Sequence, residues 1–355
     1  MKCCIRCFKD SLLQKTIEEF GTIGDCDFCS SRNVKVYDIS SQNEISDKII
    51  DLIQTYDVSL CKEAKQLKVA LHDDWNIFSG GIEAIQTLVL ALCAPYPGMD
   101  STCDRFLKNV IIPQAYDEDY INDYGVVKGQ SWQQFSDEIK YGNRFHSNLF
   151  NGDALSSFLS VDVKEIKPTD KLFRARIASD ISGFKIKEMG APPKELRRQG
   201  RANPDGIGVL YLASNEQTAL NEVRANVFDY VTIGTFKAKK NLRIVNLSAI
   251  SELSPFSFAE LASFYINRDV LREMAAEIAK PQRRSDSPLE YLSTQFISEF
   301  VKAQGYDGVA YDSTLNNGGR NFAIYDENSF KCVSVKTIEV TSVEYQHRDL
   351  KRSGA

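Results

Sequence analysis

The sequence lacks several patterns that would assign a protein of this size quickly. No run of 18 apolar residues occurs, which excludes a membrane-spanning helix. The first ten residues, MKCCIRCFKD, lack the apolar core of a signal peptide, so we expect a cytoplasmic protein. Neither GxGxxG nor GxxxxGK followed by Ser or Thr is present. These absences argue against the dinucleotide-binding turn of a Rossmann fold and against a Walker phosphate loop.

Histidine is also scarce. The chain has 3 histidines, His72, His146 and His347, and none belongs to an HExxH pattern. Hydrolysis led by a histidine base, or a metal held by several imidazoles, is therefore not expected. Arg144 and His146 are too close together for the Arg-x4-to-6-His motif of helical ribonucleases.

Composition is ordinary for a folded protein. The 355 residues are 43% hydrophobic and 26% charged, and the length favours two or three domains. The formal net charge of -5 argues against nucleic acid as the main partner, because phosphate backbones require clustered Lys and Arg.

Cysteine is plentiful, with 9 residues, and four of them form two tight pairs. Cys4-x-x-Cys7 and Cys26-x-x-Cys29 have the spacing with which four thiolates surround a Zn²⁺ ion. Such a site has no open position for water, so the zinc would be structural. Cys3 could replace Cys4 in the first pair, and the alternative for all of them is a set of reduced thiols.

The hydrophobic pattern changes near the middle of the chain. Residues 41–141 show mostly helical spacing, and 111–125, rich in Pro, Tyr and Asp, are predicted to be a loop between helices. From Lys171 onward short β-rich runs dominate. They are KLFRARIA, GVLYLA, YVTIGTF, LRIVNL, YDGVAY, NFAIYD and CVSVKTIEV.

Three helices interrupt these strands. Residues 214–224 begin with Ser214 as the expected cap, 258–279 form a second helix, and 287–303 begin with Ser287 as cap. This uneven mixture predicts an α+β fold. We expect a zinc-ribbon-like segment at 1–40, a helical domain at 41–150, a second domain at 151–340 and a polar tail at 341–355.

The second half contains separated segments that occur together in one family. Arg174 lies in an apolar strand, and Arg201 opens Arg-Ala-Asn-Pro before the strand that holds Tyr211. Glu222 is on the helix that follows, and Ser313 follows a late Asp-Gly segment before Gly319-Arg320-Asn321. From about residue 168 to 335 this order resembles the RES domain family, named for its Arg, Glu and Ser. The first half resembles the HEPN-like accessory domain found ahead of some RES domains.

The resemblance implies a toxin-like enzyme that consumes NAD on a fold related to ADP-ribosyltransferases. Arg174 and Arg201 would bind the pyrophosphate, because guanidinium groups bind such oxygens bidentately. Tyr211 would offer a flat face to a ring of NAD. Glu222 would stabilise positive charge on the ribose as the nicotinamide leaves, and Ser313 would hydrogen-bond the ribose or a phosphate. The catalytic set is thus Arg201, Glu222 and Ser313, and the NAD-binding set is Arg174, Arg201, Tyr211 and Ser313.

Several alternatives remain open at this stage. Water, phosphate or a macromolecule could accept the ADP-ribose, the last giving a mono-ADP-ribosyltransferase. A toxin or anti-phage defence effector would have an antitoxin or activator protein as partner, and the chain could also form a homo-oligomer. A different class of function is a zinc-ribbon interaction protein that binds nucleotide without turnover. Each site residue also has an ordinary structural explanation, such as an edge Arg that reaches water or a Tyr in the sheet core.

Overall fold

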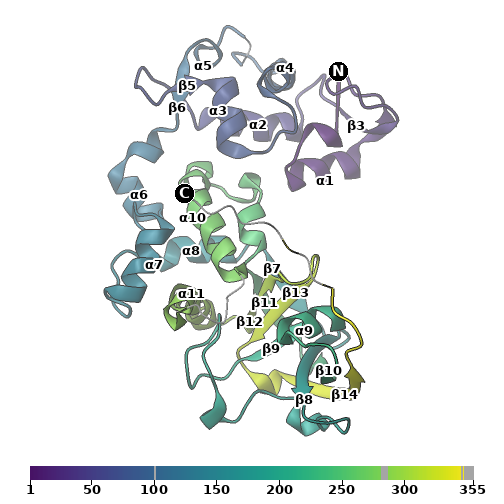
Figure 1. Cartoon of the computed structure of the whole chain (residues 1–355). Helices are drawn as coiled ribbons and strands as arrows, with labels where there is room; N and C mark the ends of the chain where they lie inside the picture. The colour runs from purple at the N-terminus through teal and green to yellow at the C-terminus, as the bar shows by residue number, and fades with distance from the viewer. Residues whose placement is uncertain (100, 281–286, 345–346, 348–355) are drawn as a thin grey trace, which may run out of the picture. The chain divides into compact units, whose positions relative to one another are not determined.

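The computed structural model describes residues 1–99, 101–280, 287–344 and 347 (Figure 1). The chain divides into two compact units. Unit 1 comprises residues 1–130, 149–154 and 252–270, and unit 2 comprises 131–148, 155–251 and 271–355. Most of the predicted polar tail lies outside the described residues. Among the described residues, no helix is both long and apolar enough to cross a membrane.

Unit 1 begins with the cysteine-rich segment. Strands β1 (Lys2–Cys4), β2 (Thr22–Gly24) and β3 (Val34–Asp38) form a small antiparallel sheet with β3 in the middle. The short turn η1 (Ile5–Cys7) follows β1, and α1 (Ser11–Phe20) begins where Asp10 accepts hydrogen bonds from the N–H groups of Leu12 and Leu13.

The rest of unit 1 is mainly helical. Its helices bury apolar stripes, as in α2, whose Ile45, Ile49 and Ile53 are fully buried. The elements are α2 (Glu44–Gln54), α3 (Leu67–Trp75), α4 (Ile82–Cys93), α5 (Asp104–Leu107), η2 (Pro113–Tyr116), α6 (Glu118–Tyr124), η6 (Pro255–Ser257) and the short strands β4 (Asp57–Val58), β5 (Lys65–Gln66) and β6 (Asn109–Ile111). Helix α8 (Gly152–Leu159), turn η5 (Ala249–Glu252) and helix α10 (Leu261–Ala279) each contain residues of both units.

Unit 2 is built on an eight-stranded sheet in the order β14-β10-β8-β9-β13-β12-β11-β7. Among the described strands of this sheet, only the β11–β12 pair is parallel. The strands are β7 (Val163–Ile166), β8 (Leu172–Ala178), β9 (Leu210–Ala213), β10 (Tyr230–Ala238), β11 (Leu242–Asn246), β12 (Gly308–Asp312), β13 (Arg320–Ile324) and β14 (Phe330–Glu339). The seven strands predicted from the sequence are all present, and β7 is one that the pattern did not reveal.

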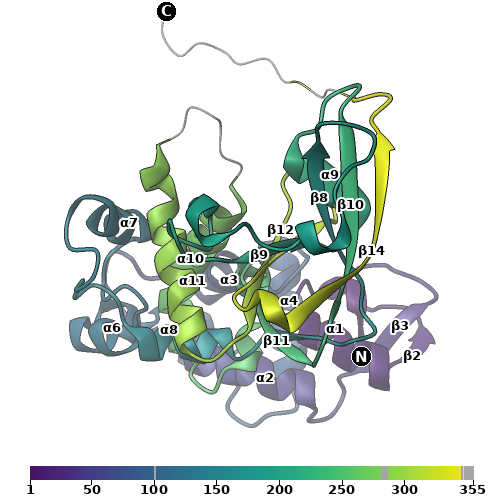
Figure 2. The ribbon, with the colours of Figure 1, turned by 90° about the horizontal axis from the view of Figure 1, so that it is seen from below.

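Strands β8 and β9 are neighbours but barely pair. Their only registered partners are Phe173 and Ala213, whereas β8 and β10 share seven registered pairs. The sheet therefore opens between β8 and β9. Helix α9 (Glu216–Val223) packs on β8 beside this opening (Figure 2). Ala175, Ala213 and Ala219 form part of the apolar cluster there.

The remaining elements of unit 2 are α7 (Trp132–Tyr141), α11 (Leu292–Ala303) and the single turns η3 (Ile186–Glu188), η4 (Lys194–Leu196), η7 (Pro288–Tyr291) and η8 (Glu327–Ser329). The mixture of helices and a largely antiparallel sheet confirms the α+β prediction.

Two local predictions are wrong. Residues 111–125 are not a loop, because Pro113 opens η2 and Asp117 caps α6 by accepting from the N–H of Tyr120 at 3.1 Å. Ser214 does not cap α9. Asn215 does, with its Oδ1 2.8 Å from the N–H of Thr218, since the hydroxyl of Ser214 accepts instead from the N–H of Arg320.

Candidate functional site

The opening between β8 and β9 contains a cavity of about 500 Å³. Its walls come from both strands, from α9, and from the loop that carries Gly200 and Arg201. Four of the five predicted site residues line it, namely Arg174, Arg201, Tyr211 and Glu222. The fifth, Ser313, contacts the site through Glu222. Residues far apart in the sequence thus meet at one place.

Glu222 is exposed near the C-terminal end of α9, and two side chains hold its carboxylate. Ser313 donates to Oε1 at 2.8 Å, and Asn321 donates through Nδ2 to the same oxygen at 2.7 Å. No described residue donates to Oε2. The carboxylate is therefore fixed by one oxygen, and the other is left for a ligand in the cavity.

Ser313 is placed by the turn after β12. Its N–H donates to the carbonyl of Gly319 at 2.8 Å, and its hydroxyl also accepts from the N–H of Leu315. Gly319 packs so closely on α9 that a β-carbon there would lie 2.2 Å from Oγ1 of Thr218. This close packing fixes the turn relative to α9 and places the hydroxyl of Ser313 within hydrogen-bond distance of Glu222.

Arg174 contributes an unsatisfied cation. Its Nη1 is buried and has no hydrogen-bond partner among the described residues. Burial lowers the pKa of the guanidinium to about 10, Arg176 acts in the same direction, and Glu327 opposes them. A buried donor without an acceptor costs stability, and a guanidinium without a carboxylate partner suits an anion. Arg174 and Ala175 face opposite sides of the strand, so the opening of the sheet lets both line the cavity.

Arg201 is held on two sides. Its Nη1 donates to the carbonyls of Ile278 at 2.9 Å and Ala279 at 3.2 Å, the last two residues of α10. Its guanidinium also lies 5.5 Å from the ring centroid of Tyr311. No described residue accepts from Nε or Nη2, so these donors remain for a ligand.

Tyr211 lines the cavity, while its hydroxyl organises the neighbouring loop. The hydroxyl donates to Oδ1 of Asn203 at 2.7 Å and accepts from the N–H of Ala202 at 3.1 Å. Burial, with Tyr311 nearby, raises the pKa of the Tyr211 hydroxyl well above its usual range. The hydroxyl therefore stays protonated and fixes the loop that carries Arg201.

Among the other residues that line the cavity, three have rings or amides suited to a ligand and were not selected from the sequence. They are Tyr291, Tyr311 and Asn321. Asn321 belongs to the segment Gly319-Arg320-Asn321, which is part of the family resemblance. That position in the sequence could have indicated a functional role for Asn321. Tyr291 and Tyr311 resemble ordinary core aromatics in sequence, and only the fold brings them to the cavity.

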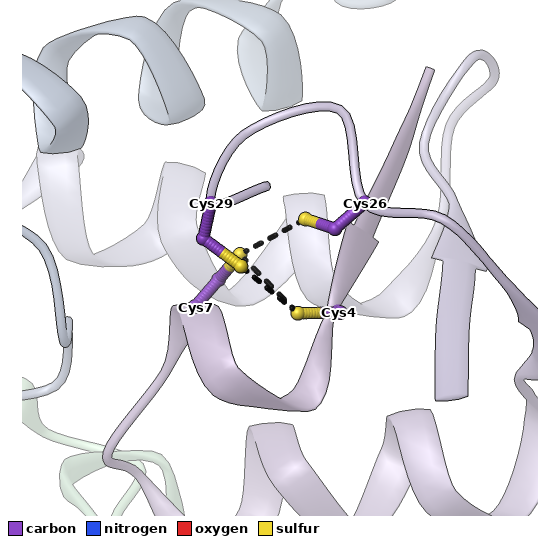
Figure 3. Close-up of side chains that lie close together, drawn as sticks. All are labelled: Cys4, Cys7, Cys26 and Cys29. Atoms are coloured by element: carbon purple, nitrogen blue, oxygen red, sulfur yellow. Dashed lines mark hydrogen bonds between the residues drawn. The ribbon is translucent and has the colours of Figure 1, made fainter. Parts of the chain in front are cut away.

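The cysteine pairs form a second candidate site, in unit 1. The Sγ atoms of Cys4, Cys7, Cys26 and Cys29 lie within 4.8 Å of one another and point toward a common centre (Figure 3). The Sγ distances are 3.9 Å for Cys4–Cys7, 3.3 Å for Cys4–Cys29 and 3.5 Å for Cys7–Cys26. A tetrahedral zinc with Zn–S bonds of about 2.3 Å separates its sulfurs by about 3.8 Å, so this donor set fits zinc. Cys4, not Cys3, belongs to the group.

The second half of the chain matches a known protein family. A sequence profile described as the RES domain matches residues 171–350, about half of the chain, and includes all five predicted site residues. The chain belongs to the RES domain family. No curated protein matches it. A solved structure that matches is that of the M. tuberculosis MbcT–MbcA toxin–antitoxin complex, at 12% identity and a TM-score of 0.31, covering 52% of this chain and 92% of that one.

Proposed function

We propose that this chain is an NAD-degrading enzyme that breaks the bond between nicotinamide and ribose. The observation that carries the proposal is the carboxylate of Glu222, which Ser313 and Asn321 hold by one oxygen at the edge of a cavity that also contains two arginines. Membership of the RES domain family supports it.

The chemistry requires few protein groups. As the bond between the anomeric carbon and nicotinamide breaks, its electron pair goes to the nicotinamide nitrogen and positive charge develops on the ribose. Glu222 stabilises this charge or binds a ribose hydroxyl through Oε2, and that interaction is stronger in the transition state than in the ground state. Nicotinamide leaves as a neutral molecule, so no strong general acid is needed. The three histidines of the chain, none of which lines the cavity, are not required.

The arginines account for the other end of the substrate. Arg174 supplies a buried donor that lacks an acceptor, and Arg201 keeps two nitrogens without partners among the described residues. A pyrophosphate provides oxygens for both. Tyr211, Tyr291 and Tyr311 provide ring faces for a base or for nicotinamide.

The direct test is the release of nicotinamide from NAD by the purified full chain, with and without phosphate, beside Glu222→Gln. We expect release by the wild type and a loss of at least about a hundredfold in the variant. Release in water alone identifies a hydrolase, and release that requires phosphate identifies a phosphorylase. Labelled ADP-ribose that stays bound to a macromolecule would instead identify a transferase. NAD that binds but stays intact would contradict catalysis.

The biological role follows from the same activity. An enzyme that destroys NAD harms the cell that produces it, so we propose a toxin or anti-phage defence effector. Such an effector needs a partner, an antitoxin or an activator, to control it.

We further propose that Cys4, Cys7, Cys26 and Cys29 hold a structural zinc. Four cysteine ligands close the coordination shell, so the ion would stabilise the small sheet of β1, β2 and β3.

A further inference from the structure

The position of Arg201 depends on helices that lie apart from the strands of the site. The side chain is held at the C-terminal end of α10, a 19-residue helix, through the carbonyls of Ile278 and Ala279. The last carbonyls of a helix have no partner within the helix and carry partial negative charge. A guanidinium group provides both the missing hydrogen-bond donors and a compensating positive charge. The end of α10 therefore fixes Nη1 of Arg201 and leaves Nε and Nη2 for a ligand.

The backbone around Arg201 is held by a second helix. On α11, Thr294, Gln295 and Ser298 are buried. Their side chains donate to main-chain carbonyls of the loop, from Thr294 to Arg201 at 2.9 Å, from Gln295 to Gly200 at 2.9 Å and to Asn203 at 3.1 Å, and from Ser298 to Ala202 at 3.0 Å. Because these bonds satisfy four successive carbonyls, the loop is docked on α11 as one piece.

One carboxylate joins these helices to a third. Glu277, directly before Ile278, accepts from the hydroxyl of Ser293 on α11 at 2.6 Å and from the indole N–H of Trp132 on α7. The hydroxyl of Ser136, also on α7, donates a hydrogen bond to the hydroxyl oxygen of Ser293 at 3.3 Å. Hydrogen bonds through Glu277 therefore link both helices that position Arg201 to α7, and Glu277 lies one and two residues before the carbonyls that bind the guanidinium.

We propose that Trp132 and Glu277 are positioning residues for Arg201. Trp132 is 3% exposed and lies outside residues 171–350, which match the family profile. The segment with α7 belongs to unit 2, the same compact unit as the cavity. The catalytic part of this chain would thus begin before the RES domain itself. The positioning role rests on the proposed NAD-degrading function only in experiments that measure turnover of NAD.

The experiment compares two matched substitutions in the full chain. Trp132→Phe removes the indole N–H that donates a hydrogen bond to Glu277. Trp75→Phe is the control, because Trp75 is also buried and also donates one indole hydrogen bond, to Tyr56 at 2.7 Å in unit 1. Loss of a hydrogen bond to a charged carboxylate weakens the support of Arg201, and so the binding of NAD. We therefore expect the KM for NAD to rise about tenfold in Trp132→Phe, with kcat changed less than threefold. We expect Trp75→Phe to change neither.

A second readout does not depend on activity. Amide hydrogen exchange across residues 200–203 should speed up about tenfold in Trp132→Phe and in Glu277→Met, and stay unchanged in Trp75→Phe. Trp132→Phe removes the donor of the bond between Trp132 and Glu277, and Glu277→Met removes its acceptor. The double variant should therefore exchange no faster than Glu277→Met. Exchange at wild-type rates in both single variants would overturn the proposal. If the wild type released no nicotinamide, the proposed function would fail, and exchange would still decide the positioning role.

Discussion

The hydroxyl of Ser313 lies 2.8 Å from Oε1 of Glu222, although 91 residues separate the two along the chain. Asn321 donates to the same oxygen at 2.7 Å. The carboxylate is thus oriented by two donors that come from one turn and one strand. This arrangement gives the carboxylate of an exposed glutamate on a short helix a defined orientation.

Removing either donor should slow the reaction more than it weakens binding. We expect Ser313→Ala and Asn321→Ala each to lower kcat for nicotinamide release about tenfold, because each deletes one hydrogen bond to a carboxylate. The double variant should lose about a hundredfold if the two bonds act independently. Steady-state kinetics on NAD measures both. A normal kcat in the double variant would show that the orientation of Glu222 is irrelevant.

Replacing Arg174 should separate stability from function. Arg174→Met removes a buried guanidinium nitrogen that has no acceptor among the described residues. We expect the free energy of unfolding to rise by about 1–2 kcal/mol while the affinity for NAD falls. Urea unfolding and calorimetric titration with NAD measure the two effects.

Arg176→Met is the matched control for that substitution. Arg176 donates to the carbonyl of Glu188 and lies 4.1 Å from the ring centroid of Phe184, so its loss should destabilise the fold. Equal destabilisation in both variants would mean that Arg174 has a satisfying partner in the folded protein.

Zinc removal should affect unit 1 selectively. We expect about one zinc per chain by metal analysis, and its removal by a strong chelator should destabilise the sheet of β1, β2 and β3. Cys26→Ser should lose the metal. Cys3→Ser should keep it, because Cys3 is buried but lies outside the four-sulfur group. A zinc-free preparation with an unchanged melting curve would rule out a structural role.

The buried carboxyl of Asp74 provides a prediction on pH. Burial raises the pKa of Asp74 above its usual value, against the opposing effects of the hydrogen bond from Tyr56 and the charge of Lys65. The folded state then binds this proton more tightly than the unfolded chain does. The cost of ionising Asp74 therefore appears as the pH rises through the unfolded pKa of about 3.9 and is complete above the folded pKa.

Asp74→Asn removes that cost and keeps an oxygen for Tyr56, which donates at 2.8 Å. We expect the variant to be more stable than the wild type at pH 7, with the difference shrinking as the pH falls toward about 4. Urea unfolding across this range tests the sign. A variant less stable than the wild type at pH 7 would show that the pair with Lys65, at 3.7 Å, outweighs the cost of burial.

Local patterns predicted the elements better than their ends. The seven strands from Lys171 onward were predictable because short runs rich in β-branched and aromatic residues are typical of strands. The cap of α9 was not, because Ser214 and Asn215 are both good caps. In the fold, Asn215 caps α9, while Ser214 is bonded through its N–H and its hydroxyl to Arg320 of β13.

The sequence by itself determined the cysteine pairs, the strands and the order of Arg, Glu and Ser along the chain, since each is a short-range pattern of residue types. Only the tertiary structure decided which atoms meet. The single registered pair between β8 and β9 opens the sheet into a cavity, and the end of α10 holds Arg201 there. Such contacts join residues far apart in the chain, and they depend on strand register and helix packing, which no local pattern of residue types specifies.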